Sequence, residues 1–119
     1  MFTGNSNQSL PPQPAPLTTP IPESSLSKHD GSNEGLPIYV VIKGDVFDVS
    51  GNPSSYGPGG GYHIFAGKDA SYALATSSLN PEDCHSDISN IDEEATNTLN
   101  NWHSFFSKRY PIVGKVVKG

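Results

Sequence analysis

The stretch PIYVVIKGDVFDVS, residues 37–50, decides the expected fold of this chain. Its first half, Ile38–Ile42, consists of β-branched and aromatic residues, the types that are enriched in strands. Lys43-Gly44-Asp45 supplies a turn, and a second apolar run follows over Val46–Val49. Two short apolar runs joined by a glycine-containing turn predict a β-hairpin.

Beyond residue 66 the pattern becomes helical. GKDASYALATSS, residues 67–78, predicts a short helix with Asp69 in its first turn and Ala70, Ala73 and Leu74 on one face. Asn80-Pro81-Glu82 then combines an N-cap residue with a proline at the first helical position. This second start signal predicts a brief helical turn.

The longest predicted helix is NIDEEATNTLNNWHSFFSKRY, residues 90–110, which has acidic residues in its first turn and Lys108 and Arg109 in its last. Its expected buried stripe is Ala95, Leu99, Trp102 and Phe106. Pro111 ends the helix, and IVGKVV, residues 112–117, predicts a short strand. Two or three strands with several short helices predict a small α+β domain.

Upstream of the hairpin, residues 1–22 hold more than half of the chain's 11 prolines and almost no charge. Such a segment buries too little apolar surface to offset its ordering entropy, so we expect a disordered tail or linker. The folded domain is expected over residues 23–119, with its first ordered residues near Ser24 or Ser25. The start MFTGNSNQSL lacks the features of a secretory signal, and no apolar run approaches the roughly 20 residues that cross a bilayer. We therefore expect a soluble cytoplasmic chain, or one whose membrane anchor lies outside this sequence.

Charge and cysteine content exclude several classes of function. The net charge of −5 argues against nucleic acid as a partner, because binding phosphates requires a basic face. The single cysteine, Cys84, excludes an intramolecular disulfide and a cysteine-based metal cage. It suits a reducing, intracellular compartment. Because of the negative net charge, we expect no nucleic-acid partner.

The glycine-rich stretch SSYGPGGGYHIFAGKDAS, residues 54–71, lacks the spacing of a phosphate-binding loop and of a dinucleotide fingerprint. The four histidines show no metal-ligand spacing, and no nucleophile-elbow motif is present. Nothing here indicates an enzyme. Tyr56 and Tyr62 bracket the glycines, and Tyr110 ends the long helix. On composition alone, these are half-buried aromatics with a solvated hydroxyl.

Three of these stretches in this order resemble the cytochrome b5-like haem/steroid-binding domain, most closely its membrane-associated progesterone receptor branch. They are the hairpin sequence, then YGPGGGYHIFAGKDASYALA, then YPIVGKVV. The resemblance covers about residues 25–117 and implies a small cytochrome b5-like fold. In that fold a mixed sheet is the floor, and helix pairs form the walls of an apolar cleft that holds haem b.

The resemblance also implies a set of site residues. Classical cytochrome b5 carries His-Pro-Gly-Gly in this loop, whereas this chain has Tyr56-Gly57-Pro58-Gly59-Gly60. The axial histidine is therefore missing, and in the receptor-like branch the position that matches Tyr62 supplies a tyrosine ligand to the iron. Tyr56, Arg109 and Tyr110 match residues around the haem. That branch often has lysine in place of Arg109, which keeps the charge but changes the hydrogen-bond geometry.

The chemistry of tyrosine agrees with this expectation. Tyrosine is an axial ligand of haem iron in some proteins, and ferric iron stabilises the phenolate. Glycines would let the backbone approach the macrocycle closely. His63 is the rival ligand, but neighbours in extended chain face opposite sides, so we expect His63 to point away from the site if Tyr62 points in.

Three functions follow from the resemblance as expectations. The first is a non-enzymatic haem-binding module that serves haem monooxygenases of sterol metabolism as an adaptor or haem donor, associated with the endoplasmic reticulum. It would form a homodimer through stacked haem faces. The second is a steroid-binding or other apolar-ligand protein without haem. The third, an electron carrier like cytochrome b5, is disfavoured by the missing histidine.

Overall fold

The predicted hairpin is present in the computed structural model, which describes residues 16–118. β2 (Tyr39–Ile42) and β3 (Asp45–Asp48) are antiparallel, with Val41 opposite Val46. Lys43 and Gly44 form the turn, with φ of 54° and 82°. Two positive φ values are typical of the two-residue turn whose twist matches the flanking strands. Asp45, expected in the turn, therefore begins β3.

The hairpin is the centre of a five-stranded sheet with the order β1-β5-β3-β2-β4, which has more strands than the two or three expected. The predicted C-terminal strand is β5 (Ile112–Val117), antiparallel to β3. β4 (Lys68–Asp69) pairs in parallel with β2, and β1 (Pro20–Pro22) pairs in parallel with β5. The ordered part thus begins before Ser24. Most of the expected tail, residues 1–15, lies outside the described residues, and its last prolines form an edge strand, a position where proline is tolerated.

Six helices connect and cover these strands in the described residues. They are the α-helices α1 (Pro53–Tyr56), α2 (Ser71–Ala75) and α3 (Glu93–Arg109) and the 3-10 helices η2 (Glu23–His29), η3 (His63–Phe65) and η4 (Pro81–Asp83). The predictions of α3 and of the turn at Pro81 are confirmed. The side chain of Asp92 caps α3 by accepting a hydrogen bond from Ala95 N at 2.8 Å.

Two helices differ from what the local sequence patterns favour. Asp69, expected in the first turn of a helix, lies in β4, and α2 begins only at Ser71. The Asp69 carboxylate still serves the start of α2, because its Oδ1 accepts a hydrogen bond from Ser71 N at 2.9 Å. The stretch from Gly51 to Gly61, whose glycines and prolines favour a loop, contains α1. A proline at the first helical position favours this short helix.

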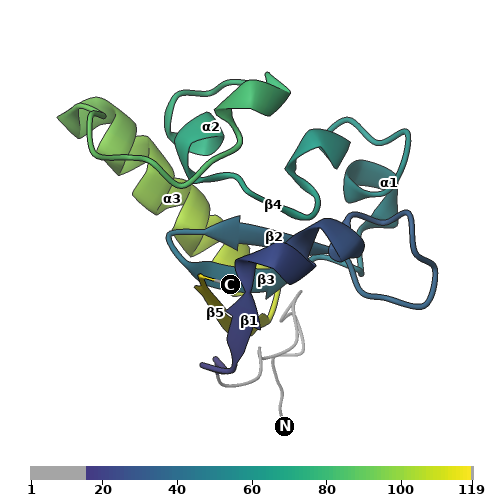
Figure 1. Cartoon of the computed structure of the whole chain (residues 1–119). Coiled ribbons are helices and arrows are strands. Elements are labelled where there is room, and N and C mark those ends of the chain that lie inside the picture. The colour runs from purple at the N-terminus through teal and green to yellow at the C-terminus, as the bar shows by residue number, and fades with distance from the viewer. Residues whose placement is uncertain (1–15, 119) are drawn as a thin grey trace, which may run out of the picture.

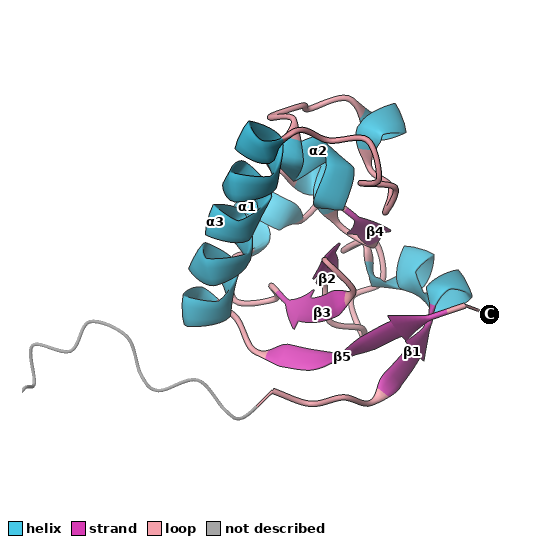
Figure 2. Cartoon of the chain, turned by 90° about the vertical axis from the view of Figure 1, so that its left-hand side faces the viewer, coloured by secondary structure: helices cyan, strands magenta, loops and turns pink. Residues whose placement is uncertain are grey.

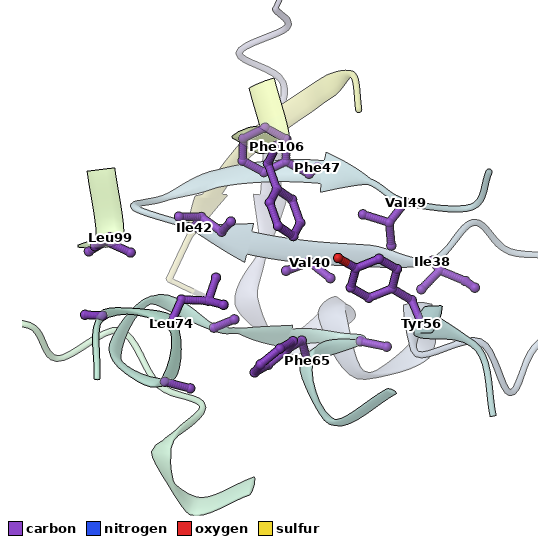
Figure 3. Close-up of a cluster of buried hydrophobic side chains, with 14 residues drawn as sticks. Ile38, Val40, Ile42, Phe47, Val49, Tyr56, Phe65, Leu74, Leu99 and Phe106 are labelled. Atoms are coloured by element: carbon purple, nitrogen blue, oxygen red, sulfur yellow. The ribbon is translucent and has the colours of Figure 1, made fainter. Parts of the chain in front are cut away.

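The alternation of side chains along the hairpin produces two cores, one on each face of the sheet. On one face, Val41 and Val46 pack with Leu26 of η2. On the other face, Val40 and Phe47 join a larger cluster that includes residues from all three α-helices (Figure 3). Figures 1 and 2 show α1, α2 and α3 on this side of the sheet, with β1 and β5 at its far end. These findings establish an α+β fold in which a mixed sheet is the floor beneath the helices.

Candidate functional site

A pocket of about 210 Å³ opens on the helix side of the sheet. Its walls come from α3, from α2 with the segment that follows it, and from the glycine-rich stretch with η3. The lining is apolar or aromatic except for hydroxyl groups, and no charged residue belongs to it: Tyr56, Tyr62, Phe65, Ala73, Leu74, Ser77, Ser78, Leu79, Trp102 and Phe106. Such a lining suits a ligand with an apolar body.

The stripe predicted on α3 supplies one wall. Trp102 and Phe106 are four residues apart, so both project from the same face of the helix. Phe106 is 1% exposed and packs against Phe47 of the sheet with ring centroids 5.5 Å apart. Trp102 also lines the pocket and is only partly buried.

Tyr56 is the buried tyrosine of the site. It ends α1, is 5% exposed and lies among the core side chains shown in Figure 3. Burial raises the pKa of Tyr56 far above its ordinary value, and the neighbouring hydroxyl of Tyr110, to which it is hydrogen-bonded, raises it further. Tyr110 in turn accepts a hydrogen bond from Asn52 Nδ2 at 3.2 Å. Tyr56 is therefore a neutral phenol whose hydroxyl already has a protein partner.

Tyr62 is the accessible tyrosine of the site. It is 44% exposed, and its ring stacks on Phe65 at 5.8 Å and lies 6.0 Å from that of Tyr56. Within the described residues, its hydroxyl forms no hydrogen bond, although the ring lines the pocket. Of the three tyrosines proposed for the site, Tyr62 is the one that lines the pocket with an unengaged oxygen.

His63 and Arg109, the other two candidate residues, have contacts of their own outside the pocket lining. His63 begins η3, and its Nδ1 donates a hydrogen bond to the carbonyl oxygen of Tyr56 at 3.0 Å. The premise of extended chain at Tyr62 was wrong, since its ψ of 19° leads directly into a helical turn. His63 nevertheless does not line the pocket. The guanidinium of Arg109 lies 4.6 Å from the Phe105 ring centroid, on the exposed side of α3.

The glycines are needed for the backbone conformation of the loop. A Cβ on Gly60 would lie 2.3 Å from the carbonyl oxygen of Ser55, and one on Gly57 would lie 2.6 Å from that of Pro53. Gly59 has a φ of 87°, which L side chains rarely adopt. None of these glycines lines the pocket. They fold the segment back on α1 and so bring Tyr62 beside Tyr56.

Sequence reasoning missed the rim of the pocket after α2. Ser77, Ser78 and Leu79 line it, and Leu79 is 61% exposed. Leu79 was detectable as an apolar residue outside every helical pattern, directly before the N-cap position Asn80. No local signal marked the two serines. Their place depends on how the chain leaves α2.

The described residues contain neither a helix that could span a membrane nor a cluster of the usual metal ligands. Between residues 16 and 118, no helix is long and apolar enough to cross a membrane. In the same part of the chain, no group of three or more His, Cys, Asp or Glu side chains could hold a metal ion.

Comparison with known proteins defines the family. Residues 22–117 match the model of the cytochrome b5-like heme/steroid binding domain. The chain is 51% identical over 92 residues to Probable steroid-binding protein 3 of Arabidopsis thaliana, covering 77% of this chain and 92% of that protein. It is 38% identical over 97 residues to neuferricin of Danio rerio, covering 82% of this chain but 36% of that protein.

A further relative and a solved structure agree with this result. Membrane steroid-binding protein 1 of Oryza sativa is 40% identical over 112 residues, and the chain spans 48% of its length. The solved structure of an Arabidopsis thaliana protein described as having a cytochrome b5 like fold superposes with a TM-score of 0.78. It is 46% identical, with 85% of this chain and 93% of that chain covered. The chain belongs to the cytochrome b5-like haem/steroid-binding domain family, in the membrane-associated progesterone receptor branch with the steroid-binding proteins and neuferricin.

Proposed function

We propose that this chain is a non-enzymatic module that binds haem b in the pocket, with Tyr62 as the axial ligand of the iron. The observation that carries the proposal is the contrast between two neighbouring phenols. Tyr56 is buried, protonated and hydrogen-bonded, whereas Tyr62 is half-exposed and has no hydrogen-bond partner in the described residues. An oxygen without a partner beside an apolar pocket is available to a metal.

The donor set fits ferric haem. A phenolate is an established axial ligand of haem iron, and the iron's charge stabilises the deprotonated form. When bound, the haem would supply a ferric centre, and an anionic oxygen ligand would hold its reduction potential low. The neutral Tyr56 hydroxyl and Tyr110 are the neighbouring groups proposed to orient the ligand oxygen. Arg109, which rests on Phe105, is proposed to act near the carboxylates at the edge of the haem.

The size of the pocket also supports a particular mode of binding. At about 210 Å³ it is smaller than the about 300–1,000 Å³ of typical ligand pockets, so a macrocycle would protrude from its mouth. A protruding apolar face offers a surface for a second copy, which supports a haem-dependent homodimer. The proposed clients are haem monooxygenases of sterol metabolism at the endoplasmic reticulum, for which the module would be an adaptor or haem donor.

A specific observation favours steroid binding as the second candidate function. The pocket's polar side-chain groups are hydroxyls and the indole N–H of Trp102, all of them neutral, which suit a neutral ligand with an oxygen atom as well as they suit haem. Relatives in Arabidopsis thaliana and Oryza sativa carry steroid-binding names. A steroid would use the same apolar walls without any bond to Tyr62.

Substitution of Tyr62 by Phe tests the proposal. Haemin added to the wild-type protein should give the broad Soret band and red charge-transfer band of tyrosinate-bound ferric haem. Tyr62→Phe should lose most of the haem while it unfolds at the same urea concentration, because the hydroxyl has no protein partner. Tyr72→Phe is the matched control, since Tyr72 stacks on His85 at 4.6 Å and does not line the pocket.

Two outcomes separate the candidate functions, and a third measurement tests the proposed dimer. Equal haem uptake by Tyr62→Phe and wild type would move the ligand elsewhere, with His63 tested next. Progesterone binding without any haem binding would support the steroid reading. Sedimentation of the same samples with and without haemin reports the proposed dimer, which is rejected if the mass does not change.

A further inference from the structure

The segment Thr76-Ser77-Ser78, which leaves α2 at the pocket rim, contains a backbone outlier. Ser77 has a φ of 56°, in the left-handed region that L side chains rarely adopt. In the described residues only one other non-glycine residue has a positive φ, Lys43 in the hairpin turn. Residues held in this region without glycine often occur at ligand-binding sites.

Local helix geometry explains why the backbone turns here. Ser78 N donates a hydrogen bond to Ala73 O at 2.8 Å, and Ser77 N donates to Leu74 O at 3.4 Å. This pair of bonds is the motif that commonly ends a helix, and its left-handed position is usually glycine. Glycine would satisfy the same bonds without the steric cost of a Cβ. The helix end therefore requires the conformation but does not explain the serine.

The three hydroxyls of the segment differ in whether they form hydrogen bonds within the protein. Thr76 Oγ1 donates to Tyr72 O at 2.8 Å. Ser78 Oγ donates to Asp83 Oδ2 at 2.6 Å and accepts from Asn80 N at 3.1 Å. Within the described residues Ser77 Oγ forms no hydrogen bond, and Ser77 lines the pocket. Ser77 and Tyr62 thus bring the two unengaged hydroxyls of the lining, from separate walls.

We propose that Ser77 is a specificity-determining residue of this pocket, whose hydroxyl donates a hydrogen bond to an acceptor oxygen on an otherwise apolar ligand. The inference rests on the proposed function and deepens it. The acceptor has two sources, a carboxylate of haem or a carbonyl of a ketosteroid, and both present an oxygen on an apolar body. Because the pocket lining has no cation, it offers such an oxygen neutral donors, and the Ser77 hydroxyl is one of them beside the Tyr62 hydroxyl and the Trp102 indole N–H.

Binding is measured with haemin and with progesterone as separate probes. Trp102, the chain's single tryptophan, lines the pocket, so quenching of its fluorescence reports both ligands. Ser77→Gly should weaken binding of progesterone by about three- to tenfold if the acceptor is its neutral carbonyl, and binding of haemin by about ten- to a hundredfold if the acceptor is its charged carboxylate. The same variant should unfold at a higher urea concentration, because glycine removes the steric cost of the left-handed backbone. Weaker binding by a more stable protein is not expected of a structural role.

Two further variants complete the test. Ser77→Ala deletes the hydroxyl but keeps the Cβ, so it should weaken binding as Ser77→Gly does without the gain in stability. Lys43→Gly is the matched control, because it relaxes the other positive φ at a site outside the pocket and should leave both affinities unchanged.

The outcomes distinguish this inference from the function on which it rests. If wild type binds haemin or progesterone and both Ser77 variants bind it equally well, the inference is wrong and the proposed function stands. A selective loss for one probe identifies the source of the acceptor oxygen. If wild type binds neither probe, the proposed function fails, and the role of Ser77 fails with it.

Discussion

The floor and the rim of the pocket differ in how completely their apolar side chains are buried. In the floor, Val40 and Phe47 are 0% exposed and pack against neighbours from the sheet and the helices. At the rim, Tyr62 is 44% and Leu79 is 61% exposed. Burial of apolar surface is the main stabilising contribution to folding. The floor therefore completes its packing within the chain, whereas the rim leaves apolar surface for a ligand to cover.

A buried carboxylate forms the junction between the floor and α3, the helix that supplies one wall of the pocket. Asp45 lies at the start of β3 and is 8% exposed. Its Oδ2 accepts a hydrogen bond from His103 Nε2 of α3 at 2.7 Å. Lys115 of β5 donates to its other oxygen. The contact fixes α3, which carries Trp102 into the pocket, against the sheet. The position of one pocket wall thus depends on a polar contact at the edge of the core.

The sharpest test of the comparison is the removal of a floor side chain. Phe47→Ala should destabilise the ligand-free protein by about 3–5 kcal/mol, because it removes buried contacts and leaves a cavity. Chemical unfolding in urea, followed by circular dichroism, measures the change. A loss below about 1 kcal/mol would mean that the sheet side tolerates voids and that the floor is not the stabilising region.

A smaller effect is expected at the junction, and it depends on pH. Although burial acts to raise the pKa of Asp45, the hydrogen bonds from Lys115 and His103 outweigh burial and hold this pKa below its ordinary value. Because the folded pKa is lowered, the contribution of Asp45 to stability is fully present above the unfolded pKa of about 3.9. It is lost as the pH falls through the folded pKa.

Asp45→Asn should therefore cost about 1–3 kcal/mol at pH 7 and progressively less below about pH 4. Urea unfolding of both proteins across this pH range gives the difference. Burial raises the pKa of Asp69, so the pH dependence that Asp69 gives to stability has the opposite sign to that of Asp45. Asp69 is present in both proteins, so its contribution cancels in the difference. A cost that stays constant with pH would show that the carboxylate's charge does not stabilise the junction.

The smallest effect on stability is expected at the rim. Leu79→Ala should change the free energy of unfolding by no more than about 0.5 kcal/mol, as is usual for exposed positions. The same substitution should weaken binding of haemin several-fold, since the ligand would lose apolar cover. Stability and affinity measured on one preparation separate the two effects. Substantial destabilisation would show that Leu79 belongs to the core, contrary to the comparison.

Much of the architecture was predictable from residues near one another in the chain. The hairpin, α3 and β5 follow from apolar periodicity and from turn and cap residues, and the order of motifs identified the family. The edge strands β1 and β4 were not predicted. They are only three and two residues long, and each exists because it pairs with a distant strand. Short strands of this kind carry too little local pattern to be recognised.

For the candidate site, the sequence by itself determined which residue types were available and which alternatives were absent. It supplied Tyr56, Tyr62 and Tyr110, and it lacked the histidine of the classical haem-ligand motif. Only the tertiary structure decided that Tyr56 is buried while Tyr62 is accessible, and that Ser77 lines the same pocket. The physical reason is that a side chain's burial and hydrogen-bond partners depend on segments far away in the sequence, which local patterns do not encode.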